Sequence, residues 1–239
     1  MGQLSPDPNP LDGRVALVTG ASRGLGRAAA LRVAGAGAHV VLLARTVGGL
    51  EETDDAVRAA GGHTTLCPLD LTASGDLERA VAALGARFGR LDILVSCAAE
   101  LGTLGPAHQT ADDAWRRVLD TNLTAAMRLI RVADPLLRRA PAGRAVFTTC
   151  SSVSRAYWGA YGASKAALEA LVRVYAAETA RTALRVNLVD PGPMRTRLRA
   201  GAFPGEDAAD LPTPDRAADL ILNLALPDST AHGHVIGRK

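Results

Sequence analysis

Two tyrosines and a lysine follow one another at intervals of four residues near position 160. They are Tyr157, Tyr161 and Lys165, in the sequence YWGAYGASK. Residues four apart share one face of a helix, so the Lys165 ammonium could stabilise the Tyr161 phenolate and lower its pKa from about 10 toward neutral pH. Such a tyrosine could act as a general acid or base. Tyr157 lacks this partner, because Tyr161 stands four positions later. A Tyr and a Lys can also share a helix face by chance.

A glycine-rich turn lies near the amino terminus, in the sequence TGASRGLG. Gly20, Gly24 and Gly26 follow an apolar run and lead into a segment with helical spacing. A cofactor pyrophosphate needs a tight turn, close approach of the backbone and free N–H groups at a helix N-terminus, and glycines in this arrangement provide all three. The sequence therefore predicts a dinucleotide-binding loop that includes Ser22 and Leu25. The alternative is an ordinary glycine-rich loop.

Two arginines favour a phosphorylated ribose. Arg23 lies in the glycine turn, and Arg45 follows the next apolar run, where an NAD enzyme usually carries an acidic residue for the ribose 2′-hydroxyl. Two guanidinium groups suit a 2′-phosphate better, so NADP(H) is predicted in preference to NAD(H), unless both arginines are solvated surface residues. Asp70, followed by Leu71, could accept a hydrogen bond from the adenine amino group or cap the next helix.

Short runs rich in Val, Leu and Thr alternate with longer Ala-, Arg- and Leu-rich segments, as in repeated βαβ units. Strands are expected at 14–19, 39–43, 64–67, 91–95, 144–149, 184–189 and, weakly, 233–237. Helices are expected at 24–36, 50–60, 77–88, 112–139, 161–180 and 214–226. Strands that are apolar on both faces need helices on both sides. This pattern predicts an α/β fold with a single Rossmann-type doubly wound parallel sheet of about seven strands.

Composition restricts the class of protein further. Of 239 residues, 48% are hydrophobic but only 3% are aromatic, which suits one domain with an Ala-, Val- and Leu-rich core. The 27 basic and 24 acidic residues are interspersed, which argues against a nucleic-acid partner. The sequence shows no bilayer-spanning run and no metal-ligand spacing of its three cysteines, so we expect no membrane partner, no metal and a reducing, cytoplasmic location. Residues 1–12 are expected to form a mobile tail before a domain at 13–239.

Taken together, the motifs resemble those of the short-chain dehydrogenase/reductase family. The glycine loop, PLDL, LDTNLTAA, YGASK and DPGPMRT occur in the family's order over nearly the whole chain. The resemblance implies that Tyr161 is the general acid or base and that Lys165 lowers the pKa of Tyr161 and holds the nicotinamide ribose. It also implies that Asn122 anchors a water relay.

The same resemblance implies a nicotinamide site in DPGPMRT. Pro191 and Gly192 would shape a turn against the nicotinamide, and Thr196 would hold its carboxamide; the alternative is a plain Pro/Gly loop. The substrate lid is expected between residues 194 and 212. This segment carries several arginines, which could bind an acidic or phosphorylated substrate or could simply be surface residues.

One departure from the family pattern follows the expected fourth strand. The family usually has Asn-Ala-Gly there, whereas this chain has Cys97, Ala98 and Ala99, which weakens a brace between strands and adds a methyl group where the cofactor passes. Cys97 and Cys150 end neighbouring strands. Their thiols could therefore come within disulfide reach, or they could only fill space.

A second departure concerns the family's catalytic serine, which orients the substrate carbonyl. It usually lies thirteen residues before the tyrosine, and Thr148 stands there. Counting from the start of the fifth strand gives Cys150, whereas the local text Ser-Ser-Val gives Ser151 or Ser152. The loop is therefore shorter than usual, and Ser151 is our choice for the catalytic position. Each of these serines could instead be a turn former.

Three functions compete. The Tyr, Lys and Asn favour an NADP(H)-dependent oxidoreductase that passes hydride between nicotinamide and the carbonyl or secondary alcohol of a small molecule. The two departures favour a non-catalytic cofactor-binding protein that acts as a scaffold or biosynthetic partner. An isomerase or dehydratase of the same fold has no feature of its own here. The family further implies a homodimer or homotetramer formed through the helices at 112–139 and 161–180, but it does not imply the substrate.

Overall fold

The computed structural model describes residues 9–73 and 75–237, which form alternating strands and helices. The strands are β1 (Val15–Thr19), β2 (His39–Ala44), β3 (His63–Pro68), β4 (Ile93–Ser96), β5 (Arg144–Thr148), β6 (Arg185–Val189) and β7 (Val235–Ile236). The α-helices are α1 (Gly24–Gly35), α2 (Val47–Ala59), α3 (Asp76–Phe88), α4 (Asp112–Leu119), α5 (Ala125–Leu137), α6 (Gly159–Thr179), α7 (Arg197–Ala202) and α8 (Asp215–Ala225). Short 3-10 turns η1 (Ala107–Gln109) and η3 (Ala208–Asp210) and a π-helical turn η2 (Asp120–Thr124) complete the described elements.

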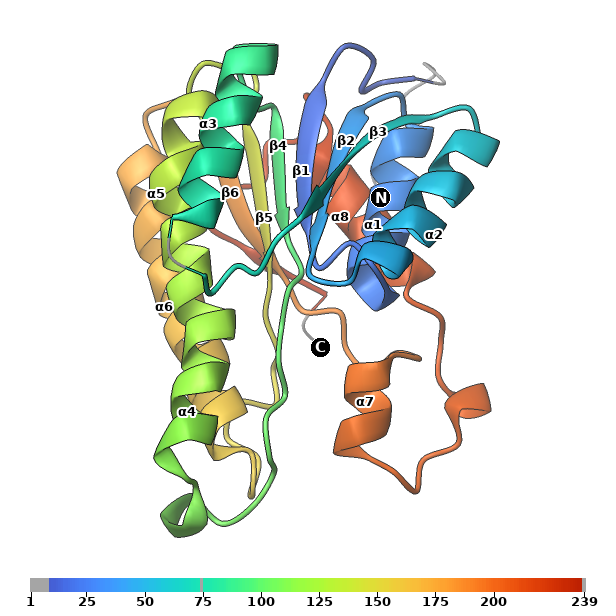
Figure 1. Ribbon diagram of the computed structural model, residues 1–239. Coiled ribbons are helices and arrows are strands. Elements are labelled where there is room, and N and C mark those ends of the chain that lie inside the picture. The colour runs from blue at the N-terminus through green and yellow to red at the C-terminus, as the bar shows by residue number, and fades with distance from the viewer. Residues whose placement is uncertain (1–8, 74, 238–239) are drawn as a thin grey trace.

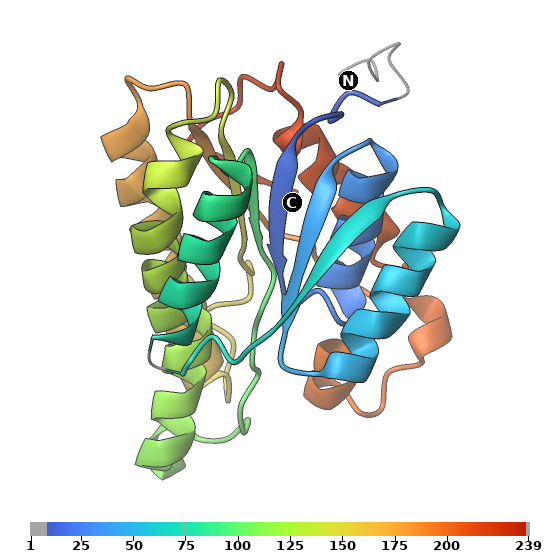
Figure 2. The same ribbon diagram turned by 45° about the horizontal axis from the view of Figure 1, so that its top comes forward.

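The seven strands found in the described residues form one parallel sheet in the order β3-β2-β1-β4-β5-β6-β7. Helices α1, α2 and α8 cover one face and α3, α5 and α6 cover the other (Figure 1 and Figure 2). The predicted α/β doubly wound fold is confirmed. The strand order reverses between β1 and β4, and at such a point the carboxyl ends of the strands flank a crevice in which ligands bind.

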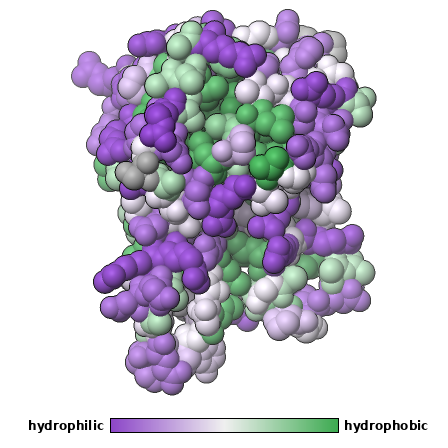
Figure 3. All heavy atoms as spheres, viewed as in Figure 1, coloured by the Kyte–Doolittle hydropathy of each residue, from purple (hydrophilic) through white to green (hydrophobic). Residues whose placement is uncertain are grey.

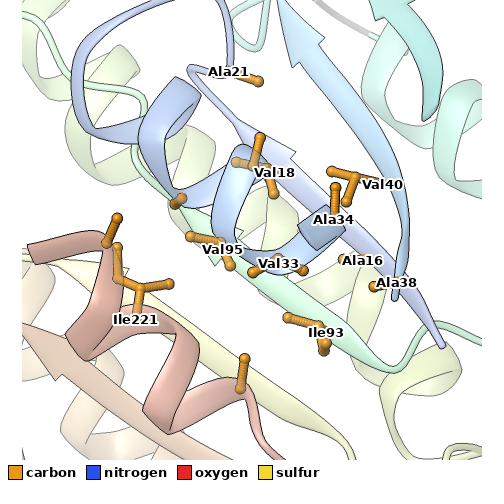
Figure 4. Close-up of a cluster of buried hydrophobic side chains, with 14 of the residues drawn as sticks. Ala16, Val18, Ala21, Val33, Ala34, Ala38, Val40, Ile93, Val95 and Ile221 are labelled. Atoms are coloured by element: carbon orange, nitrogen blue, oxygen red, sulfur yellow. The ribbon is translucent and has the colours of Figure 1, made fainter. Parts of the chain in front are cut away.

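Alternation along the strands divides the core into two layers. Val18 belongs to the layer that also contains Val33 of α1 and Ile221 of α8, and Figure 4 shows these side chains together. Leu17, one position earlier, points to the opposite face and packs with residues of α3, α5 and α6. The two layers fix β1 and its neighbours from both sides, so the ends of these strands form a rigid base for a site.

The predicted helix at 112–139 is wrong in one detail. It consists of α4, the π-helical turn η2 and α5, and Asn122 lies in that turn. A π turn inserts one extra residue into a helix and often marks a functional position. Periodicity over the whole segment could not reveal it, because the apolar spacing on either side remains helical.

The amino-terminal boundary also differs from the prediction. Residues 1–8 of the expected tail at 1–12 lie outside the described residues. Leu11, however, is fully buried, and its backbone N–H donates a hydrogen bond to the carbonyl of Ala36 at 2.9 Å. The packed part of the chain therefore begins before residue 13. None of the described helices combines the length and the apolar character needed to cross a bilayer.

Candidate active site

A cleft of about 440 Å³ opens at the carboxyl ends of β1, β2, β4, β5 and β6. Figure 3 shows apolar side chains between the lobe that carries α4 and the lobe that carries α7. All the residues predicted to bind the cofactor line this cleft: Gly20, Ser22, Arg23, Gly24, Leu25, Gly26, Arg45, Asp70, Leu71, Cys97, Ala98, Tyr161, Lys165, Pro191, Gly192 and Thr196. Ser151 also lines it, whereas Asn122 lies outside the lining. The topology therefore brings segments from six parts of the chain to one place.

The glycine loop has the backbone geometry that the sequence predicts. Gly20 has a φ of 68°, and a Cβ atom there would lie 2.9 Å from the backbone nitrogen of Ala98. A Cβ atom on Gly26 would lie 2.2 Å from the carbonyl oxygen of Gly20. Only glycine fits either position, so α1 can begin directly against the end of β1. Its free N–H groups then face the cleft, as an anion site requires.

Two cations lie at the end of the cleft formed by the glycine loop and β2. Arg23 is exposed, and the guanidinium of Arg45 lies 3.7 Å from the carboxylate of Asp70. Asp70 also accepts hydrogen bonds from the backbone and the hydroxyl of Thr72 at 2.8 and 2.7 Å. Burial alone would raise the Asp70 pKa, but the hydrogen bonds and Arg45 lower it overall. Asp70 therefore holds the turn before α3 and pairs with Arg45.

Tyr161 and Lys165 are both buried in the first two turns of α6, with 7% and 2% of their surfaces exposed. The Lys165 ammonium donates a hydrogen bond to the carbonyl of Thr148 at 2.8 Å and lies 5.9 Å from the centre of the Tyr161 ring. Burial lowers the pKa of Lys165 to about 8, although the thiols of Cys150 and Cys97 oppose this shift. The two side chains share one wall of the cleft, as their spacing predicts.

The predicted pKa of Tyr161 is wrong in direction. Burial, followed by the influence of Cys150 and Asp190, raises the Tyr161 pKa above its ordinary value. The Lys165 ammonium points to the Thr148 carbonyl, so its charge does not outweigh the loss of water around the phenol. Tyr161 therefore keeps its proton at neutral pH in this structure.

Asn122 braces the catalytic helix from behind. Its side-chain oxygen accepts a hydrogen bond from the N–H of Glu100 at 2.8 Å, and its amide donates to the Glu100 carbonyl and to the Ser164 hydroxyl, both at 2.9 Å. Ser164 in turn donates to the carbonyl of Tyr161 at 2.7 Å. The π turn thus ties the loop after β4 to the first turn of α6. Sequence reasoning missed Ser164, which signals its role only by its place inside the YGASK motif.

The segment between β5 and α6 brings a cysteine to the catalytic pair. The thiol of Cys150 interacts electrostatically with both Tyr161 and Lys165, and it accepts a hydrogen bond from the N–H of Ser152 at 3.4 Å. Ser151 and Ser152 are exposed. Of the three candidates for the serine position, Cys150 is thus the one that the structure connects to the Tyr–Lys pair.

Thr148, the candidate given by counting back from Tyr161, is already engaged. Its carbonyl binds Lys165, and its hydroxyl donates to the carbonyl of Ser96 at 3.1 Å. The hydroxyl of the next residue, Thr149, is buried and has no hydrogen-bond partner among the described residues. Because Thr149 lines the cleft, this hydroxyl is a group that a ligand could satisfy.

Gly162 explains how a short loop reaches the helix. A Cβ atom on Gly162 would lie 2.1 Å from the carbonyl oxygen of Val153, so the loop packs directly on the backbone of α6. Gly162 is buried inside a helix, where glycine costs about 1 kcal/mol relative to alanine. That unfavourable placement is the signal that sequence reasoning missed.

Comparison with known proteins agrees with this geometry. A family model described as short chain dehydrogenase matches residues 14–207. The uncharacterized oxidoreductase YciK of Escherichia coli K12 is 36% identical, over 94% of this chain and 90% of its own length.

The chain belongs to the short-chain dehydrogenase/reductase family.

Solved structures of similar chains show the same arrangement. A short chain dehydrogenase from Pseudomonas syringae is 39% identical, covers 98% of both chains and superposes with a TM-score of 0.93. A short chain dehydrogenase from Escherichia coli CFT073, complexed with NADPH, is 37% identical, with a TM-score of 0.91 over 96% of this chain and 98% of that one. Both likenesses extend over nearly the whole chain and so include the segments that line the cleft.

Two cysteines of this short-chain dehydrogenase follow neighbouring strands: Cys97, where the family usually has asparagine, comes after β4, and Cys150 comes after β5. Cys97 and Cys150 both act to raise the pKa of Lys165, against the larger effect of burial, and neither forms a disulfide in the structure. Burial raises the pKa of Cys97 to about 12, which keeps it a neutral thiol. Such a thiol is a poor partner for disulfide exchange. Within the described residues there is no cluster of three His, Cys, Asp or Glu side chains that could hold a metal.

Proposed function

We propose that this protein is an NADP(H)-dependent oxidoreductase that transfers hydride between nicotinamide and the carbonyl or secondary alcohol of a small molecule. The observation that carries the proposal is the burial of Tyr161 and Lys165 together in the cleft that also contains the glycine loop. A titratable pair shielded from water beside a dinucleotide site is suited to proton transfer coupled to hydride transfer.

The residues of the cleft fit a dinucleotide. The glycine loop packs directly on the backbone after β4 and on its own backbone, so α1 begins at the cleft, and the Thr149 hydroxyl, which has no hydrogen-bond partner among the described residues, offers a further polar contact. Pro191, Gly192 and Thr196 line the same cleft and would hold the nicotinamide. Arg23 and Arg45 supply two cations for a ribose 2′-phosphate, and the NADPH complex of the Escherichia coli CFT073 protein supports the same preference.

Nicotinamide would supply or accept the hydride, and the protein's own groups would handle the proton. Because the Tyr161 pKa is raised, its hydroxyl holds the proton that reduction must deliver to the carbonyl oxygen. Lys165 uses one of its three N–H donors on Thr148, which leaves two for the ribose and the tyrosine oxygen. Asn122 and Ser164 keep the start of α6 in place; the role of Asn122 in a water relay stays a prediction.

We assign the position beside the carbonyl to Cys150 rather than to Ser151. Cys150 lines the cleft, is less exposed than Ser151, and acts to raise the pKa of both Tyr161 and Lys165, and its sulfur accepts a hydrogen bond from the N–H of Ser152. A thiol is a weaker hydrogen-bond donor than a hydroxyl, so the carbonyl would be oriented less firmly. This weakness is the specific observation that favours the second candidate function, a non-catalytic cofactor-binding protein.

The test is a panel of carbonyl compounds and alcohols followed by NADPH absorbance, with Tyr161→Phe as the control. Loss of the proton donor is expected to lower kcat by about 10²- to 10⁴-fold and to leave NADPH affinity within about twofold. Activity that persists in Tyr161→Phe would remove the mechanism. Tight NADPH binding without turnover of any compound would favour the non-catalytic candidate.

The cofactor preference has its own test. Arg45→Asp is expected to weaken NADPH binding by about tenfold or more, because hydrogen bonds to charged groups contribute about 1.5–3 kcal/mol, while NADH binding changes little. Isothermal titration with both cofactors measures this difference. Tighter binding of NADH than NADPH by the unmodified protein would overturn the assignment of Arg23 and Arg45.

Association into a homodimer or homotetramer is also part of the proposal. Trp115, Met127 and Val174, on α4, α5 and α6, expose 38%, 38% and 56% of their surfaces, and large apolar side chains exposed on neighbouring helices are typical of subunit contacts. Light scattering of the purified protein tests it. A reducing, cytoplasmic location is retained as a prediction from the unpaired cysteine pattern.

A further inference from the structure

The part of the cleft next to Tyr161 has an apolar wall. Trp158, Met194, Leu198 and Ala202 line it, the last two from helix α7. A Cβ atom on Gly201 would lie 3.7 Å from the Leu101 side chain, so α7 also reaches the loop after β4. Helix α7 therefore lines this part of the cleft and also contacts the loop after β4.

Trp158 is the centre of this wall. Only 7% of its surface is exposed, and its ring meets the Tyr161 ring edge to face, with centroids 5.5 Å apart and planes at 81°. The ring centroid of Phe203, the residue directly after α7, lies 5.8 Å from that of Trp158. We call these two residues the Trp158–Phe203 pair. It joins the loop that carries Cys150 to the lid.

The guanidinium groups of two arginines pack against the Trp158–Phe203 pair. The Arg155 guanidinium lies 4.6 Å from the centre of the Phe203 ring and 5.7 Å from that of Trp158. The Arg199 guanidinium lies 3.6 Å from the Phe203 centre and makes two hydrogen bonds to the Glu206 carboxylate, at 2.5 and 2.6 Å. Phe203 and Arg155 contact the indole, and Arg199 holds Phe203, so the indole is fixed and the small part of Trp158 that stays exposed lines the cleft.

Most of the arginines of the lid already bind other groups of the protein. Arg195 donates to the carbonyls of Ala208, Ala209 and Leu211, and Arg199 is paired with Glu206. Arg197 lines the cleft and makes no hydrogen bond or ion pair with the rest of the described chain, but it is exposed at the rim. The arginines that suggested an acidic substrate therefore form the lid itself rather than an anion site.

Resting on the proposed oxidoreductase function, we propose that Trp158 determines specificity and that the substrate is an uncharged carbonyl compound bearing a rigid ring. The ring would pack on the fixed indole and the apolar residues of α7, while the carbonyl would reach the Tyr161 hydroxyl and the Cys150 thiol. An apolar wall beside the reacting group favours compounds with a rigid ring, since aromatic and alicyclic rings bury their surface there with less loss of conformational freedom than a flexible chain.

Steady-state kinetics with NADPH and three carbonyl probes tests the proposal: an aryl ketone, a cyclic ketone and a straight-chain ketone of equal carbon number. In Trp158→Ala, KM is expected to rise at least tenfold for the two ring compounds and less than threefold for the chain, with NADPH affinity unchanged. Trp158→Phe, which keeps a flat ring, is expected to restore most of the preference. An equal loss for all three probes in both variants would overturn the proposal.

A binding measurement separates this inference from the oxidoreductase function. In a Trp115→Phe protein, Trp158 is the remaining tryptophan, since the chain contains two. With NADP⁺ present, the ring ketones are expected to quench its fluorescence and the chain ketone to quench it weakly, whether or not turnover occurs. If ring ketones quench but are not reduced, the oxidoreductase function fails. If the protein reduces carbonyl compounds but prefers one that carries a carboxylate, and the KM of that compound rises tenfold in Arg197→Gln, the specificity proposal is wrong. The oxidoreductase function then stands.

Discussion

The loop after β1 and the loop after β5 both connect a strand to a helix at the cleft, but they line the cleft with different groups. Each leads from a buried strand into a helix at the edge of the cleft, and in each a glycine lets two backbone segments meet. Gly26 admits the carbonyl of Gly20, and Gly162 admits the carbonyl of Val153. The first loop lines the cleft with glycine backbone and the Arg23 side chain, whereas the second loop and the start of α6 line it with the side chains of Cys150, Trp158 and Tyr161. Close approach of the backbone requires only glycine, whereas the position of a side chain in the cleft also depends on the length of the loop that carries it.

Gly26→Ala is expected to have the largest effect on this comparison. Its Cβ atom would lie 2.2 Å from a backbone oxygen, so α1 must move away from β1. We expect a loss of about 3 kcal/mol in the free energy of unfolding, from overpacking, and at least about a hundredfold weaker NADPH binding, because the phosphate loop moves with the helix. Urea unfolding and NADPH titration measure the two effects.

Gly35→Ala is the matched control for the glycine substitution. Gly35 lies at the other end of α1, with no heavy atom within 4 Å of its Cβ position. Alanine there is expected to stabilise the protein by about 0.5 kcal/mol, since it has the higher helix propensity. Equal behaviour of the two alanine variants would show that close approach at Gly26 is not needed.

Gly162→Ala makes the corresponding change in the catalytic loop. The loop must shift off α6, and Cys150 and Trp158 shift with it. Displacement of a site by about 1 Å can cost about a hundredfold in rate, so kcat/KM is expected to fall by that order while NADPH affinity changes less than about threefold. A parallel loss of NADPH affinity would mean that the two loops are not independent, and the comparison would break.

The two loops also differ in how far sequence reasoning reached. The backbone geometry of the glycine loop follows from its residue types, because the close contacts at Gly20 and Gly26 admit only glycine, while its binding of a cofactor stays a prediction. Tyr161 and Lys165 were predicted from helical spacing, which does not depend on tertiary contacts. Which residue takes the serine position stays a prediction, because a shortened loop changes which residue faces the tyrosine and the sequence does not show where the loop packs. The pKa of Tyr161 could not be predicted either, since it depends on burial.

Cys150 and Ser151 test that part of the comparison directly. If Cys150 contacts the carbonyl, Cys150→Ala is expected to lower kcat about tenfold, the value of one hydrogen bond of about 1.4 kcal/mol. Cys150→Ser restores a stronger donor and is expected to match or exceed the unmodified enzyme, whereas Ser151→Ala stays within about twofold. The reverse order, with Ser151→Ala the weaker enzyme, would return the role to Ser151.

The smallest expected effect concerns backbone strain in the catalytic loop. The left-handed positions of the glycine loop are occupied by glycine, with φ of 68° at Gly20 and 55° at Gly24. Tyr157 has a φ of 70° and is the one non-glycine residue with positive φ among those the structure describes. This conformation costs about 1–2 kcal/mol for most side chains and less for asparagine.

Tyr157→Asn is therefore expected to stabilise the protein by about 1 kcal/mol, which raises Tm by about 2–4 °C for a chain of this size. The Tyr157 side chain is 64% exposed, so little packing is lost, and the backbone hydrogen bond from Gly105 to the Tyr157 carbonyl can remain. Tyr157→Ala is the control, because it removes the ring but keeps a Cβ atom in the left-handed conformation, and it should gain less than Asn. If Asn and Ala gave the same Tm, the strain would not lie in the backbone. If Asn raised Tm and lowered kcat/KM, the strained tyrosine would be part of how this loop holds Trp158 against Tyr161, a constraint that the glycine loop does not carry.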